Sequence, residues 1–180
     1  MTMVIATEIK ESDRIAEFNK HFSWFLDQNV TDWLYENGFF RQAASTKFHG
    51  SYEGGLFDHS LSVMLNLNKL TGRLDLKWER MQSPFIVGMF HDLCKIDQYE
   101  KKNGSFIWKK SELPGHGDKS VILLSRLMKL TEEEMACIRY HMGAFTDKEE
   151  WTKYTDAIHT YKNVLYTHTA DMIASHIEMT

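Results

Sequence analysis

The residues of this 180-residue chain that are best suited to chemistry are its nine histidines, which stand beside only two cysteines. Histidine is the commonest metal ligand in proteins, and it also titrates near neutral pH. Cys94 and Cys137 are too few to build a disulfide framework or a thiolate zinc site, and both are expected to be reduced and buried. The composition therefore favours a metal centre built from nitrogen and oxygen ligands.

The pair His91-Asp92 is the clearest candidate, because it follows the apolar run 85–90. A helix that is apolar nearly all round is buried, so the pair is expected in the interior of the protein. A buried carboxylate without a partner is costly, or its pKa shifts until the group is neutral. A bound metal ion would compensate the charge of Asp92.

Further candidates recur at helical spacing. His59 follows the three-and-four rhythm of Leu56 and Val63, and His168 follows that of Leu165 and Met172, so both are expected to face inward. Each histidine taken alone is more typical of a packed residue than of a ligand, but several helices that direct such side chains to one interior can build a metal site. The other members of this set are His116, His141 and Asp171, whereas His21, His159 and His176 lack supporting context and are interpreted as structural or surface residues.

The elements that must position these side chains are predicted to be helices, so the fold class is all-α. Only two prolines and ten glycines interrupt the chain, and no internal repeat or linker divides it. The first predicted helix is capped by Ser12, and the second begins at Thr31 and ends at Asn37-Gly38. A third spans 56–71, and a fourth runs from Ser83-Pro84 to about Cys94. Two more begin near Gly117 and at a Thr131 capping box, and the last spans 155–177.

Residues 98–110 break the helical pattern. Asn103-Gly104 is a strong signal for a two-residue β-turn, so a small β-hairpin is expected there. The hairpin carries four lysines interleaved with aromatic residues, a combination that can bind phosphates and stack bases. A solvated hairpin with an aromatic face packed on the core explains the same pattern, so both interpretations stay open.

The order His59, His91-Asp92, Asp171 resembles the H…HD…D pattern of the HD-domain superfamily of metal-dependent phosphohydrolases. The resemblance covers about residues 48–175, and four elements in the right order make it far more specific than a lone His-Asp pair. The matching strings are Gly54-Gly55-Leu56-Phe57-Asp58-His59-Ser60, Phe90-His91-Asp92-Leu93-Cys94-Lys95 and His168-Thr169-Ala170-Asp171. His116 and His141 stand where binuclear members carry two extra histidines, although Tyr140 and Met142 replace the second histidine that some members have beside the latter.

The resemblance implies a ligand set and a reaction. The metal ligands would be His59, His91, Asp92, His116, His141 and Asp171, with Asp92 as a bridge and catalytic residue. Lys95 would be catalytic and approach the substrate phosphate, and His49 and His168 are further candidates for substrate contacts. One or two divalent ions of manganese, iron, nickel, cobalt or zinc would activate a water, whose hydroxide attacks the phosphate ester of a nucleotide or a short single-stranded oligonucleotide.

Two alternatives to this hydrolase remain open. Some binuclear relatives use the same ligands for di-iron oxygenase chemistry, and a metal-bearing module could bind a nucleotide without turnover. The formal charge of −4 argues against long duplex nucleic acid as a partner. No apolar segment is long enough for a membrane span or a signal peptide, so a cytoplasmic protein is expected.

The length of the chain favours one compact domain. Within it, residues 1–47 are expected to form an N-terminal helical cover over an HD-type core at residues 48–180. The cover carries Trp24, Phe25 and Trp33, which could also contribute to a homodimer contact.

Overall fold

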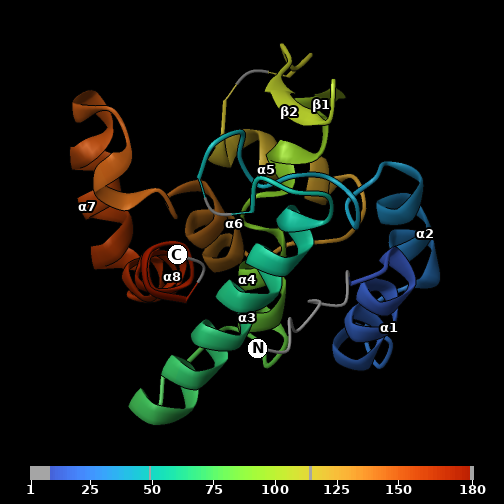
Figure 1. Cartoon of the computed structure of the whole chain (residues 1–180). Coiled ribbons are helices and arrows are strands. Elements are labelled where there is room, and N and C mark those ends of the chain that lie inside the picture. The colour runs from blue at the N-terminus through green and yellow to red at the C-terminus, as the bar shows by residue number, and fades with distance from the viewer. Residues whose placement is uncertain (1–8, 49, 114, 179–180) are drawn as a thin grey trace, which may run out of the picture.

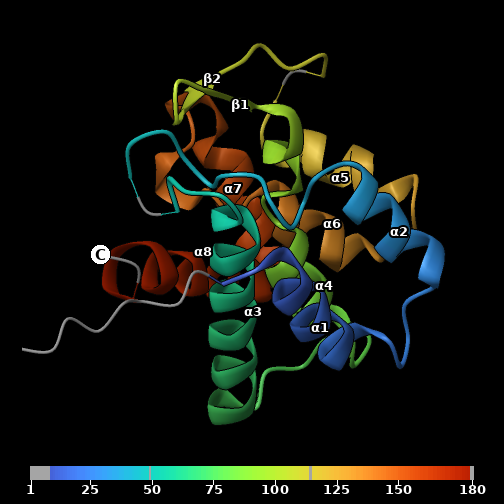
Figure 2. The ribbon, with the colours of Figure 1, turned by 45° about the vertical axis from the view of Figure 1, so that its right-hand side comes forward.

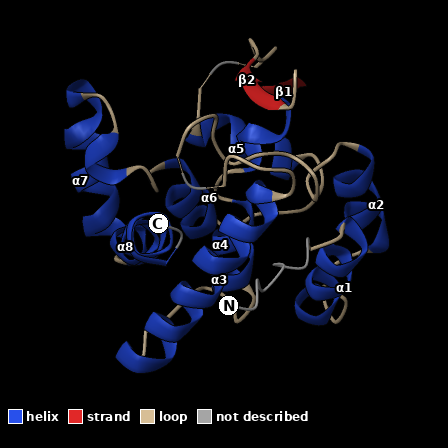
Figure 3. Cartoon of the chain, in the orientation of Figure 1, coloured by secondary structure: helices blue, strands red, loops and turns tan. Residues whose placement is uncertain are grey.

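The computed structural model describes residues 9–48, 50–113 and 115–178, and these residues form a mostly helical protein with one small β-hairpin, as predicted from the sequence (Figures 1 and 3). None of the described helices is long and apolar enough to cross a membrane. The helices and strands are α1 (Glu11–Phe22), α2 (Gln28–Glu36), α3 (Gly55–Leu74), α4 (Ser83–Phe90), β1 (Tyr99–Lys102), β2 (Ser105–Trp108), α5 (Gly117–Ser125), α6 (Glu132–Arg139), α7 (Trp151–Thr160) and α8 (Asn163–Ile173).

The centre of the fold is the packing of the long helix α3 against α4 and α8. Figure 2 shows α3 as an upright helix with α8 on one side and α4 on the other. Gly88 of α4 makes the close approach possible, because a Cβ atom there would lie 2.4 Å from the Met64 Cα of α3. Helices α5 and α6 pack against each other, and α6 also contacts α4 and α8.

Helix α1 packs over α4 through a cluster of aromatic side chains. The Phe18 and Phe22 rings stack with their centroids 4.4 Å apart, and both contact Phe90. Arg14 of α1 also forms a two-pronged ion pair with Asp58 of α3, with both nitrogen–oxygen distances at 2.8 Å. Helix α1 is therefore fastened to the elements that carry or precede His59 and His91.

Two helix starts were predicted a few residues late. Ser12 and Thr31 lie inside α1 and α2, whose caps are Lys10 and Asp27, although α2 does end at Asn37 with Gly38 at φ 83°. The capping box at Thr131 is confirmed, since its Oγ1 accepts from Glu134 N at 3.2 Å. Gly72 does not end α3, which continues to Asp75 at φ 51°.

The predicted C-terminal helix is wrong in its continuity and in its buried face. The helix is interrupted at Tyr161, and a π-helical turn at 174–178 (η4) follows α8. The break places Asn163 in the interior, where its Nδ2 donates to Lys77 O and Glu133 Oε1, both at 2.8 Å. As a result α8 buries Val164, Thr167 and Ala170, and Leu165 is exposed. Tertiary hydrogen bonds thus override the periodicity of the sequence.

The β-hairpin is confirmed at its predicted place. Asn103 and Gly104 take positive φ values of 51° and 83°, and Tyr99 pairs with Trp108 across the ladder.

Candidate metal centre

Asp92 lies at the centre of a buried cluster, at a bend that the sequence did not predict. Helix α4 ends at Phe90 instead of running to Cys94, and a 3₁₀ turn at 93–97 (η1) follows Asp92. In a continuous helix, neighbouring side chains point about 100° apart. The bend at Asp92, with φ −102° and ψ 18°, allows His91 and Asp92 to face the same interior. Lys95 therefore lies in the 3₁₀ turn and not on the helix of His91.

One half of the cluster joins α3, α4 and α8. His59 Nε2 lies 3.2 Å from His91 Nε2 and 3.2 Å from Asp171 Oδ1. Oδ2 of Asp92 lies 3.6 Å from His59 Nε2 and 3.5 Å from His91 Nε2. Four predicted ligands thus converge with their donor atoms toward one point.

The other half of the cluster lies between α5 and α6. His116 Nε2 is 3.1 Å from His141 Nε2, and these nitrogens lie 2.8 Å and 3.5 Å from Asp92 Oδ1. Gly117 makes this possible, because a Cβ there would lie 2.1 Å from the Arg139 carbonyl oxygen at the end of α6. The two carboxylate oxygens of Asp92 therefore face different halves, which is the arrangement of a bridging ligand.

The ends of α4 and α6 fix the protonation of two histidines. His91 Nδ1 donates to Gly88 O at 2.8 Å, and His141 Nδ1 donates to Ile138 O at 2.7 Å. The last carbonyls of a helix have no partner within the helix, so each imidazole satisfies one of them. With the proton held at Nδ1, the lone pair of Nε2 faces the cluster, as a metal ligand requires.

The spacing of the donor atoms fits a metal ion. Ligand atoms about 2.1 Å from a metal lie roughly 3.0–3.4 Å from one another in octahedral or tetrahedral sites. The His59–His91 and His116–His141 nitrogen distances of 3.2 Å and 3.1 Å match this spacing. Asp92 Oδ1 is buried and makes no well-aligned hydrogen bond among the described residues, although His116 Nε2 lies 2.8 Å away, so a cation held by both atoms would supply the missing interaction.

The charges of the cluster are arranged to keep its carboxylates ionised. Burial raises the pKa of Asp92, but the charge of Lys95, whose Nζ lies 2.7 Å from Oδ2, acts together with His91, His116 and His141 and lowers the pKa well below its usual value. Burial likewise raises the pKa of Asp171, whereas its hydrogen bond with His59 and the nearby imidazoles of His91 and His141 together lower the pKa overall. Burial lowers the pKa of His59, which keeps its imidazole neutral and available as a ligand.

The three predicted site residues that are not metal-ligand candidates lie in different places. Lys95 lies inside the cluster through its contact with Asp92. His168 lies behind the cluster, because its Nδ1 donates to the His141 carbonyl at 2.9 Å and its ring packs against Gly143. His49 lies outside the described residues.

Cys94 is a neighbour of the centre that sequence reasoning missed. Its Sγ lies 3.2 Å from His116 Nδ1, and it forms a third possible ligand group with Asp92 and His116. Burial raises the pKa of the Cys94 thiol to about 12, so this side chain is a thiol at neutral pH. Its position two residues after Asp92 was the only signal for this contact in the sequence.

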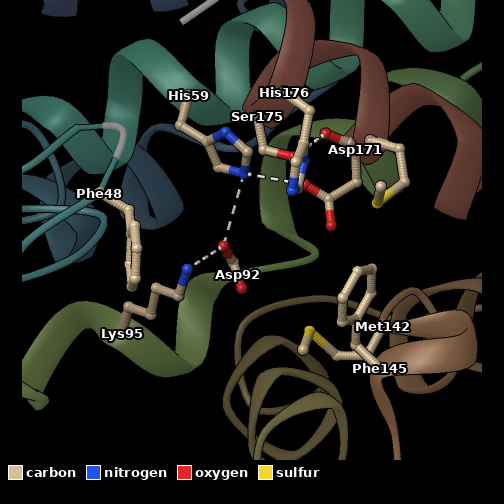
Figure 4. A pocket seen from close by; sticks show the side chains of 10 residues that line it. Phe48, His59, Asp92, Lys95, Met142, Phe145, Asp171, Ser175 and His176 are labelled. Carbon is tan, nitrogen blue, oxygen red and sulfur yellow. Dashed lines mark hydrogen bonds and ion pairs between the residues drawn. The ribbon is translucent and has the colours of Figure 1, made fainter. Parts of the chain in front are cut away.

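A pocket of about 610 Å³ opens onto the half of the cluster that contains His59, Asp92 and Asp171 (Figure 4). Its walls include residues that carried no functional signal in the sequence, namely Phe48, Met142, Phe145, Met172, Ser175 and His176. No described residue of the hairpin lines this pocket, and Lys101 of the hairpin is paired with Glu53 at 2.7 Å. The lysine-rich hairpin thus lies apart from the pocket.

The described residues show a buried group of histidine and aspartate side chains that could hold a metal ion, as a metalloenzyme would. Two of the groups of close donor atoms share Asp92 with a histidine from α5 or from the end of α6. Comparison of the chain with protein-family models, with curated proteins and with solved structures gives no match in any of the three cases.

Proposed function

We propose that this chain is an HD-type, metal-dependent phosphohydrolase or phosphodiesterase that cleaves a phosphate ester of a nucleotide or a short oligonucleotide. The observation that carries the proposal is the position of Asp92, whose two oxygens face two groups of histidines while Lys95 stands beside it at the pocket. The order of these residues along the chain also resembles the pattern of the HD superfamily.

The residues present fit one or two divalent ions. His59, His91, Asp92 and Asp171 would hold the first, and His116, His141 and Asp92 would hold the second. A bound divalent ion would polarise the phosphoryl group and make a nucleophile available near neutral pH. Histidine-rich ligands favour manganese, iron, nickel, cobalt or zinc over magnesium.

Lys95 is the side chain of this protein that would balance the negative charge of the substrate phosphate. Its Nζ opens onto the pocket and is held by Asp92 at 2.7 Å. When a phosphate group enters, Nζ would donate a hydrogen bond to a phosphoryl oxygen and balance the negative charge that develops there. His168 would act indirectly, by holding the backbone of His141 in position.

The proposal is tested with Asp92→Asn, which keeps the shape of the side chain but removes its charge. Metal content and hydrolysis of p-nitrophenyl phosphate and bis(p-nitrophenyl) phosphate are measured after loading with manganese. The variant should lose bound metal and lower both rates by at least about 100-fold. Asp75→Asn is the matched control, since Asp75 is 84% exposed and pairs only with Lys77 at the surface. Equal metal content and equal rates in Asp92→Asn and the parent would overturn the proposal.

A further inference from the structure

The pocket beside the candidate centre has one charged end, and its other walls are mainly apolar, with Ser175 and His176 as polar exceptions. Its polar end is formed by His59, Asp92, Lys95 and Asp171. Away from that end, apolar side chains from three separate segments surround the space, and Figure 4 shows Phe48 on one side with Met142 and Phe145 on the other. A ligand that fills it must therefore carry an anionic group at one end and an apolar body at the other.

Two of these walls are phenylalanines that the fold leaves exposed. Phe48 and Phe145 are 78% and 64% exposed, although the fold buries six other phenylalanine side chains almost completely. Exposed aromatic side chains at the mouth of a pocket are costly in water unless a ligand covers them. Both rings are placed where they would contact the same ligand.

The ring of Phe145 is held in place before any ligand arrives. It stacks on His176 at a centroid distance of 6.3 Å and an interplanar angle of 18°, and it lies 6.4 Å from the ring of His168. Its backbone follows Gly143, whose φ of 56° fixes the turn. Such a pre-positioned ring loses little conformational freedom when it stacks on a flat group.

The cluster has a second opening, and the walls of this opening are acidic. A second hollow of about 360 Å³ opens onto His116, and it shares only Met142 and Phe145 with the first pocket. Asp118, Asp147 and Glu150 line it, and its Arg139 is already paired with Asp118 at 2.5 Å. This acidic hollow disfavours a further anionic group, so Met142 and Phe145 separate an apolar side from an acidic side.

We propose that the site is specific for phosphate ligands that carry a flat aromatic group, and that Phe48 and Phe145 grip this group on the apolar side. The proposal rests on the proposed function and narrows its substrate class to monophosphate esters of an aromatic or base-bearing alcohol. Ligands that extend with further phosphates toward the acidic hollow are disfavoured. Phe48 and Phe145 are thereby specificity-determining residues that do not touch the metal.

The test compares two probes that differ only in the aromatic group, phenylphosphonate and methylphosphonate. Calorimetric titration of the manganese-loaded chain measures binding directly, so leaving-group chemistry does not enter. Phenylphosphonate should bind at least about tenfold more tightly. Phe145→Ala and Phe48→Ala should each remove most of this preference, leave methylphosphonate binding unchanged and keep the metal content of the parent. Phe145→Tyr should retain the preference.

Trp108→Ala is the control, because Trp108 is 66% exposed but lies on the hairpin and not in the pocket. Equal affinity for the two probes, or an unchanged preference in both phenylalanine variants, would overturn the inference. If the phenyl preference holds but no phosphate ester is hydrolysed, the inferred ligand class stands and the proposed hydrolase activity fails.

Discussion

Lys95 Nζ lies 2.7 Å from Asp92 Oδ2, the oxygen that faces His59 and His91. The lysine therefore stands where a divalent ion would place its own positive charge. It stabilises the carboxylate when no ion is bound, and it repels an ion that takes up the same oxygen. The positive charge of Lys95 should consequently weaken the binding of a metal ion and strengthen the binding of a phosphate group.

Substituting Lys95→Gln should therefore change two properties in opposite directions. Metal affinity should rise a few-fold, because the competing ammonium is gone, and hydrolysis of p-nitrophenyl phosphate should fall about tenfold or more. Metal titration and steady-state kinetics measure the two effects separately. Lys101→Gln on the hairpin should change neither, and a Lys95→Gln variant that binds metal more weakly would contradict the expectation.

His168→Phe tests the residue behind His141. The phenyl ring preserves the packing on Gly143 but cannot donate to the His141 carbonyl. Loss of such a supporting hydrogen bond should weaken metal binding about tenfold. Metal titration of this variant is compared with His159→Phe, which changes an exposed histidine of α7. Unaltered affinity in His168→Phe would show that packing alone positions His141.

Gly88→Ala tests the contact between α3 and α4. Its Cβ would lie 2.4 Å from Met64 Cα, so the helices must separate and the unfolding free energy should fall by about 1–3 kcal/mol or more. Gly72→Ala is the matched control, because no atom lies within 4 Å of its Cβ position in α3. There the unfolding free energy should rise by about 1 kcal/mol, through helix propensity. Urea denaturation measures both, and similar changes in the two variants would contradict the close contact.

The metal-free protein should lose stability in acid in two stages. The pKa of His59 is lowered from 6.5 by burial, so folding favours its neutral form and stability declines as the pH falls below about 6.5. The pKa of Asp171 is lowered from 3.8, so a second decline begins below that value as the pH approaches the folded-state pKa. Urea denaturation with a chelator, at several pH values, measures both stages. Asp171→Asn should reduce the second stage, and it should deepen the first, because the hydrogen bond of Asp171 raises the pKa of His59 against the effect of burial.

Much of the helical fold could be predicted from the sequence, since helix ends and turns depend on local signals. The Thr131 capping box, the Asn103-Gly104 turn and the end of α2 all lie where residue types predict them. The identities of the clustered side chains also followed from their types and order. His59, His91, Asp92 and His141 lie together in the interior as expected.

The features that could not be predicted depend on contacts between distant segments. The break at Tyr161 depends on hydrogen bonds from Asn163 to residues 77 and 133, which no local pattern reveals. The bend after Phe90 is likewise not predicted by any glycine or proline within residues 90–97. The apolar walls of the pocket were missed because Phe48 comes from a loop and Phe145 from a single 3₁₀ turn, and neither segment is long enough to show periodicity.

The sharing of Asp92 between the two halves has a consequence for how the protein would fill with ions. One half contains two carboxylates, Asp92 and Asp171, whereas the other relies on His116, His141 and the remaining oxygen of Asp92. A first ion would take the more acidic half and would neutralise the carboxylate that a second ion needs. Loading should therefore be stepwise and negatively cooperative, with a half-filled species dominant over a range of free-ion concentrations. The supply of metal would then set how many ions, and which chemistry, each molecule carries.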